Sequence, residues 1–265
     1  MKRLLHLEWS KLKKPIIFTH IICLAFMTIL TLTLYKNYGL EYDIEAWELP
    51  NEYFSFIFPL LVVFPTCWLF YYERKNQYIM YTLPRTSKRK YLFAKWLVIA
   101  GNGFVLMFTT MFVGVVVALY IKPDIESILT MVDPNTNELI SQVKLTHFMG
   151  EMFSEQPLLY GFLFSIWRGL LGIIMATMGF VLSLYSRNIF IILTGPFIYS
   201  ILENYILSIL QVPQFRLVTS FEPDTLSFLE LSPFSILVGP VIAIIFILGL
   251  YFFFAKIKKI SIYPS

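Results

Sequence analysis

Two charged residues stand inside long apolar stretches of this chain, and they are the first candidates for chemistry. Arg168 lies in one stretch and Glu203 in the next, with only a tight connector at Arg187 between them. Two antiparallel helices joined in this way would hold both side chains at a similar level. Because a charge in apolar surroundings needs a partner, we expect an Arg168–Glu203 ion pair. Such a pair could clamp two helices together or line a substrate cavity.

Motifs for catalysis and for metal binding are missing from the sequence. There is no G-x-x-x-x-G-K-[ST] loop, so the chain is not expected to hydrolyse ATP by itself. Neither H-E-x-x-H nor G-x-S-x-G occurs, and His6, His20 and His147 are scattered. We therefore expect no catalytic residues, no metal site and no cofactor held by this chain.

The elements that would position Arg168 and Glu203 are membrane helices. The chain is 57% hydrophobic and 14% charged, where about 25% charged is usual for a soluble domain. Six stretches reach the roughly 20 residues that cross a bilayer as a helix, and none alternates as a barrel strand does. They are Ile16–Tyr35, Tyr53–Tyr72, Trp96–Ile121, Leu158–Ser186, Ile189–Leu210 and Ser235–Ala255. The fold class is thus an all-α integral membrane protein, with residues 1–265 as a single domain.

The distribution of charge between the stretches predicts the orientation. Most of the 21 lysines and arginines lie before the first stretch, in alternate connectors and in the tail, whereas most acidic residues lie in the other connectors. Only Glu8 and Glu73 share the basic side. By the positive-inside rule, both termini are cytoplasmic. The basic charge is therefore explained by topology, and we expect no nucleic-acid partner.

The segment before the first stretch, residues 2–14, resembles an interfacial helix. Leu5, Trp9 and Leu12 share one helical face, with lysines around them. Pro15 is expected to end this helix before the first span begins. The apolar run that follows is too long for a signal peptide, so we expect it to be retained.

The exterior segments are predicted to be Lys36–Glu52, 122–157 and 211–234. Three prolines, Pro213, Pro223 and Pro233, indicate short broken helices lying at the surface in the last of them. Within the fourth span, the small residues of Gly172-x3-Ala176 would let helices approach closely.

The connector 73–95 carries the densest group of basic residues. Glu73 comes directly after the second span, and Leu83–Pro84, Ser87–Lys88–Arg89 and Lys95 follow in that order. In this order, and in its six spans, the chain resembles the type-2 ABC transporter permeases, the membrane subunits of many bacterial ABC exporters. Many members have Gly-Thr shortly after the Glu, whereas this chain has Asn76-Gln77.

The resemblance implies that the connector is a coupling loop that docks on a separate ABC ATPase. The residues expected at this contact are Glu73, Arg74, Lys75, Leu83, Pro84, Arg85, Ser87, Lys88 and Arg89. Two ATPase copies would bind ATP and Mg²⁺, and a second permease copy or a sister permease would complete the transporter. The basic residues would also meet anionic lipid headgroups.

The expected function is the permease subunit of an ATP-driven exporter in a bacterial plasma membrane. Aromatic-rich, apolar spans favour a hydrophobic or amphipathic cargo, such as a peptide, an antimicrobial or a drug. A non-transporting scaffold or sensor subunit and a proton-coupled carrier are the alternatives. A membrane-embedded enzyme lacks the clustered acidic, His or Ser groups that it would need.

Overall fold

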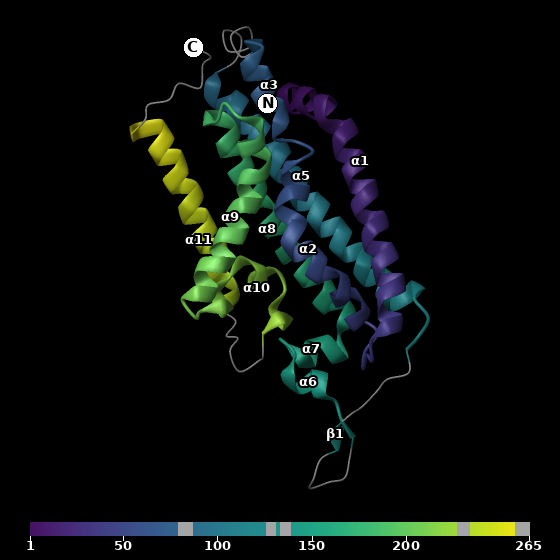
Figure 1. The fold of residues 1–265 in the computed structure, drawn as a ribbon. Coiled ribbons are helices and arrows are strands. Elements are labelled where there is room, and N and C mark those ends of the chain that lie inside the picture. The colour runs from purple at the N-terminus through teal and green to yellow at the C-terminus, as the bar shows by residue number, and fades with distance from the viewer. Residues whose placement is uncertain (79–86, 126–130, 133–138, 227–233, 258–265) are drawn as a thin grey trace.

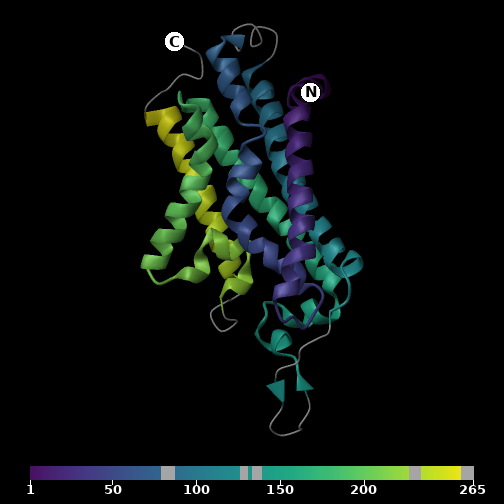
Figure 2. The same ribbon diagram turned by 45° about the vertical axis from the view of Figure 1, so that its right-hand side comes forward.

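A computed structural model describes residues 1–78, 87–125, 131–132, 139–226 and 234–257. In this part of the chain, six helical segments are long and apolar enough to cross a membrane, which confirms the predicted fold class. They form one elongated bundle (Figures 1 and 2). The first residue and the C-terminal end of the last helix lie at the same end of it (Figure 1), as an even number of spans requires.

The helices extend beyond the predicted spans at several ends. The first segment is α1 (Lys2–Leu34), followed by the 3₁₀ turn η1 (Tyr35–Asn37). The second consists of α2 (Glu45–Val63) and α3 (Trp68–Lys75), and the third of α5 (Lys88–Val116) and the π-helical turn η3 (Val117–Ile121). The others are α8 (Pro157–Tyr185), α9 (Ile189–Ile209), and α11 (Ser235–Phe252) with the π-helical turn η7 (Phe253–Ile257).

Smaller elements gather at the far end of the bundle from the N-terminus. These are the strands β1 (Met131–Val132) and β2 (Leu139–Ile140), which pair antiparallel, and the helices α6 (Gln142–Thr146) and α7 (Gly150–Glu155). The 3₁₀ turns η4 (Pro213–Phe215) and η5 (Pro223–Thr225) flank the short helix α10 (Leu217–Phe221).

Proline shapes two of the spans, in the first of them differently from expectation. Pro15 lies inside α1 and does not end it. The first turns of α1 nevertheless lie across the end of the bundle (Figure 1), and a proline, which cannot donate the helical N–H bond, accounts for such a bend. Pro65 lies in the turn that separates α2 from α3, so the second span is broken in the same physical way.

The core lies where α5 meets α8. A Cβ atom added at Gly103 would come within 2.7 Å of the Gly172 carbonyl oxygen, and one at Gly172 would come within 2.4 Å of the Gly103 oxygen. Ala176 also lies against Gly103. The two backbones are thus in direct contact, as the small-residue spacing predicted. Trp47 of α2 is fully buried beside them and donates its indole N–H to the Met111 carbonyl.

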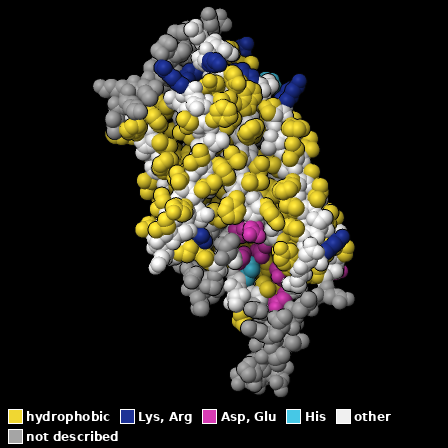
Figure 3. Space-filling view, in the orientation of Figure 1, with side chains coloured by type: hydrophobic (Ala, Val, Ile, Leu, Met, Phe, Trp, Pro, Cys, Tyr) yellow, Lys and Arg dark blue, Asp and Glu magenta, His cyan; other side chains and the backbone are white. Residues whose placement is uncertain are grey.

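Charge divides the bundle into two ends. Lysines and arginines gather at the end where α1 begins, and acidic side chains gather near the other end (Figure 3). We call these the basic end, with Lys13, Lys75, Lys88 and Arg89, and the acidic end, with Asp43, Glu48 and Asp224.

Candidate functional site

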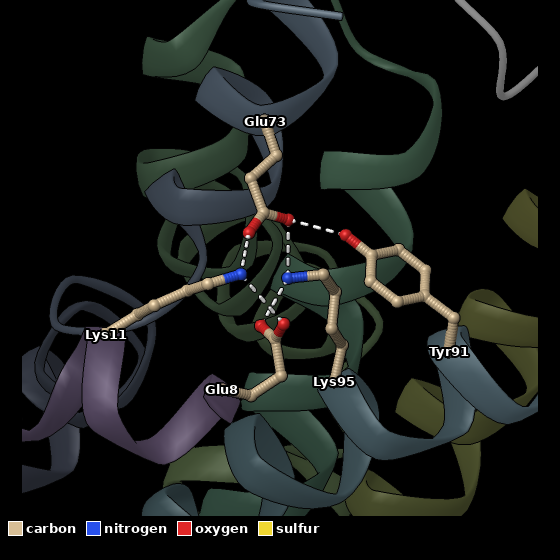
Figure 4. A network of polar contacts seen from close by, with 5 residues as sticks. All are labelled: Glu8, Lys11, Glu73, Tyr91 and Lys95. Atoms are coloured by element: carbon tan, nitrogen blue, oxygen red, sulfur yellow. Dashed lines mark hydrogen bonds and ion pairs between the residues drawn. The ribbon is translucent and has the colours of Figure 1, made fainter. Parts of the chain in front are cut away.

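Five polar side chains form a buried network at the basic end (Figure 4). We call it the basic-end network, and its members are Glu8 and Lys11 of α1, Glu73 of α3, and Tyr91 and Lys95 of α5. Glu8 and Lys11 are three residues apart, and Tyr91 and Lys95 four apart, so each pair shares a helix face. Three helices that are distant in sequence therefore meet at one cluster of charges.

The two carboxylates and the two ammonium groups alternate. The Glu73 carboxylate lies 2.7 Å from Lys11 Nζ and 2.5 Å from Lys95 Nζ, and it accepts a 2.8 Å hydrogen bond from the Tyr91 hydroxyl. Glu8 completes the ring by contacting Lys95 and by accepting a 3.0 Å bond from Lys11. The formal charges of these four groups cancel, which is the arrangement that makes buried ions tolerable.

The network is shielded from solvent. The side chains of Lys95, Glu8 and Glu73 are 3%, 4% and 7% exposed, and Lys11 is 28% exposed. Lys95 also lies 5.0 Å from the centre of the Tyr91 ring, where a cation is attracted to the ring face. Removing one of the four charged members would leave an uncompensated charge in this enclosed position.

Arg74 holds the same region to a second part of the bundle. Its guanidinium donates to the carbonyl oxygens of Leu184 and Ser186, at the end of α8. The last carbonyls of a helix have no partner within the helix and carry its negative dipole end, so a cation is favoured there. The end of α3 is thereby fixed to α1, α5 and the α8–α9 turn.

The predicted ATPase-contact residues fall into two groups. Glu73 and Arg74 are buried and already paired, so they brace the connector and are not free to form a docking surface. Lys75, Ser87, Lys88 and Arg89 are exposed at the basic end. Leu83, Pro84 and Arg85 lie outside the described residues.

The predicted apolar face of residues 2–14 is only partly turned away from the bundle. Leu12 is buried in the bundle, Leu5 is half-buried, and Trp9 is 43% exposed. Glu8, on the inner side of this segment, is buried as well. The segment therefore packs against protein through the Glu8–Leu12 side and leaves Trp9 outward.

Arg168 and Glu203 do not form the predicted ion pair. Arg168 donates from Nε to the Phe221 carbonyl at 2.9 Å and lies 4.4 Å from the centre of the Trp47 ring. Both carboxylate oxygens of Glu203 accept the Leu217 N–H, at 3.0 and 3.1 Å. Each charge thus binds one end of α10, the acid at its N-terminus and the arginine at its last carbonyl, where unpaired backbone groups of matching polarity occur.

The segment that separates them was expected at the surface. The turns at Pro213 and Pro223 and the short helix between them were predicted correctly, but all five residues of α10 are buried. Pro233 lies outside the described residues. Phe221 stacks on Phe58 of α2 with ring centres 4.8 Å apart, and Trp167 donates to the Ser220 carbonyl at 2.7 Å. Irregular backbone is tolerated inside an apolar bundle when protein surrounds it and its N–H and C=O groups are hydrogen-bonded. Protein surrounds α10, and the polar groups at both of its ends are paired.

A third cluster lies at the acidic end and was missed from the sequence. His147, at the end of α6, lies 3.0 Å from the Glu48 carboxylate and 3.1 Å from that of Asp224. We call these three residues the acidic-end triad. Burial by itself lowers the pKa of His147, but the hydrogen bonds to Asp224 and Glu48 outweigh it and raise the pKa to about 10.

No periodicity could have revealed the triad, because its members belong to three distant segments. The basic-end network did leave a signal. Glu8 and Glu73 are the exceptional acids on the basic side, and an acid among bases is a candidate for pairing.

Comparison with known proteins supplies the family. A model of the ABC-2 family transporter proteins matches residues 4–150, which include the basic-end network and its connector. Neither the curated proteins nor the solved structures gave a match. The matched region covers more than half of the chain. With its six membrane-spanning helices, this chain belongs to the ABC-2 family of transporter proteins and is a multi-pass membrane subunit of an ABC transporter.

Proposed function

We propose that this protein is the permease subunit of an ATP-driven exporter and that the connector 73–95 couples it to a separate ABC ATPase. The observation that carries the proposal is the basic-end network. It fixes the start of the connector at Glu73 and its end at Lys95 to the same helix, α1, and Tyr91 joins the two ends by its hydrogen bond to Glu73. A connector anchored at both ends can transmit a push from a docked ATPase to the spans.

The exposed charges beside this anchor would provide the docking contacts. Lys75, Lys88 and Arg89 are exposed next to buried, immobilised residues. Exposed basic residues accelerate association with an acidic partner surface and select its orientation. Glu73 would then act by holding the loop in place. The transporter would contain two permeases and two copies of the partner ATPase, and the ATPase copies would bind ATP and Mg²⁺.

The cargo is proposed to be hydrophobic or amphipathic, such as a peptide, an antimicrobial or a drug. The support is the apolar character of the surfaces between helices. A groove of about 410 Å³ lies between α9 and α11 and is lined almost wholly by apolar side chains, including Ile198, Leu202, Ile242 and Phe246. Sites for apolar ligands have such linings.

A charge-reversal experiment tests the coupling. The permease is co-expressed with a candidate ABC ATPase from the same organism, and the complex is isolated in detergent through a tag on the permease. We expect Lys88→Glu with Arg89→Glu to lose the ATPase, since reversed charges repel an acidic partner surface.

The control is Lys13→Glu with Lys14→Glu, which reverses two exposed lysines at the same end but outside the connector. It should retain the ATPase. Equal loss in both double variants would point to unspecific charge attraction, and retention in both would contradict docking at the connector.

A further inference from the structure

Three segments of the acidic end converge on one imidazole. Glu48 comes from the first turn of α2, His147 from the end of α6, and Asp224 from η5. The side chains are 15%, 7% and 23% exposed. Figure 3 shows acidic side chains gathered around a histidine in a hollow near this end. One donor atom from each residue lies within 4.8 Å of the others.

The orientation of the imidazole is fixed from behind. Nδ1 of His147 lies 2.9 Å from the Phe148 carbonyl oxygen, which can only accept, so Nδ1 carries a hydrogen and donates it. The ring packs on Phe153 with centres 3.8 Å apart. A backbone carbonyl on one nitrogen is the usual support that presents the other nitrogen to a metal ion. Here Nε2 faces the two carboxylates.

Such an arrangement favours a proton or a metal cation between the groups. With Nδ1 protonated, a neutral imidazole would direct the Nε2 lone pair at the Glu48 and Asp224 carboxylates, which is repulsive. A proton on Nε2, a proton on one of the two carboxyl groups, or a metal ion between the ligands removes the repulsion. Asp224 is held as well, because its carboxylate accepts the Phe148 N–H at 3.3 Å.

We propose that the acidic-end triad binds a divalent transition-metal ion of the zinc type. One imidazole nitrogen and two carboxylate oxygens form a three-ligand set that leaves a fourth position open to water. A tetrahedral site with bonds of about 2.0–2.1 Å places neighbouring ligand atoms about 3.3 Å apart. The observed separations of 3.0 and 3.1 Å to Nε2 therefore need to widen only slightly.

The ligand types select the metal. Two carboxylates balance the charge of a divalent ion, and the imidazole disfavours Mg²⁺ and Ca²⁺, which prefer oxygen ligands alone. Metal binding would displace the Nε2 proton of His147 to solvent. The ion would tie the start of α2, the α6–α7 region and the segment before α11 to one another at the acidic end.

Zinc titration of the full-length protein in detergent tests the site after treatment with a chelator. We expect calorimetry to show a single Zn²⁺ ion per chain. The thermal midpoint should rise on the order of 5 °C when free Zn²⁺ exceeds the dissociation constant about a hundredfold. Mg²⁺ at the same concentration should give neither effect.

Two variants and two controls locate the binding. Asp224→Asn keeps an oxygen for the Phe148 N–H and should weaken Zn²⁺ binding at least about tenfold. His147→Gln should abolish it. Glu155→Gln, an exposed acid of the same end, and His6→Gln, an exposed histidine of the other end, should bind as the unchanged chain does.

Several results would overturn the proposal. If the unchanged protein does not bind Zn²⁺, the triad holds only a proton. Binding that survives Asp224→Asn would place the ion elsewhere, and equal binding of Mg²⁺ would contradict the donor argument. If His147→Gln fails to fold, the comparison of Asp224→Asn with Glu155→Gln still decides between these results.

Discussion

The basic-end network and the acidic-end triad solve the problem of buried charge in different ways. At the basic end, two carboxylates meet two lysines, so the formal charges cancel without any further ion. At the acidic end, two carboxylates meet one histidine, which is a cation only when protonated. The basic-end network is therefore stable over a wide pH range, whereas the acidic-end triad depends on a proton or a metal ion from the solution.

This difference matches what each end is proposed to do. A connector that transmits force needs ion pairs that stay formed under all conditions, and the permanently charged groups of the basic-end network provide them. A cluster whose cohesion depends on a proton or a metal ion can respond to the medium on its side of the membrane. Four perturbations of buried and exposed charges test this difference between the two ends.

The largest effect is expected from Lys95→Met. The change removes the more deeply buried of the two lysines that Glu8 and Glu73 share, and truncating one member of a buried ion cluster costs about 3–5 kcal/mol. Denaturant unfolding in mixed micelles would measure the loss of unfolding free energy. Adding Glu8→Gln to Lys95→Met should recover part of it. If Lys95→Met unfolds like the unchanged chain, the network does not stabilise the basic end.

The two intramembrane charges provide the second test. Since Arg168 and Glu203 bind opposite ends of α10 and not each other, Arg168→Glu and Glu203→Arg should each cost about 3 kcal/mol. The double exchange should be no more stable than the worse single variant, as measured by thermal unfolding. Recovery in the double exchange would show that the two charges do interact directly.

The third test uses pH at the acidic end. Hydrogen bonds to Asp224 and Glu48 outweigh burial and raise the pKa of His147 to about 10, from about 6.5 in an unfolded chain. Stabilisation by protonated His147 is thus complete below about pH 6.5 and is lost as the pH rises towards 10. We expect a loss on the order of 2–3 kcal/mol, since the partial exposure of Asp224 weakens the pairing.

Thermal unfolding between pH 6.5 and 9.5 with a chelator present would measure this loss. The His147→Gln protein is the control. Its stability should vary less over this interval, because of the triad only Glu48 still titrates there, with a pKa that burial and Asp224 raise to about 8. Parallel curves for the two proteins would show that the triad does not hold its proton as described.

The smallest effect on stability is expected from Lys88→Glu with Arg89→Glu. Both residues are exposed, and surface charges typically change the unfolding free energy by less than about 0.5 kcal/mol. The same denaturant assay would confirm that the loss of ATPase binding expected for this variant does not come from misfolding. A large destabilisation would instead assign these residues a structural role.

Composition and charge were sufficient to predict the six spans, because a bilayer requires long apolar helices whatever their packing. The basic connector was also predictable, as were its anomalous acids Glu8 and Glu73. That Glu8 and Glu73 belong to one network was not predictable, because they lie 65 positions apart and only the packing of α1 on α3 brings them together. The Arg168–Glu203 prediction was wrong for a related reason. Hydropathy does not reveal α10, because this helix is only five residues long. It packs among the spans, and its two ends provide the backbone partners of Arg168 and Glu203.

The Glu73→Gln variant tests whether the basic-end network couples the ATPase to the spans. The complex of permease and ATPase is reconstituted in lipid nanodiscs, and ATP hydrolysis is measured with and without cargo. If Glu73 braces the connector without touching the ATPase, the variant should keep the ATPase bound, yet lose most of the stimulation by cargo. The Glu155→Gln protein, which is neutralised at the other end, should behave as the unchanged complex does. Full stimulation in Glu73→Gln would contradict the account.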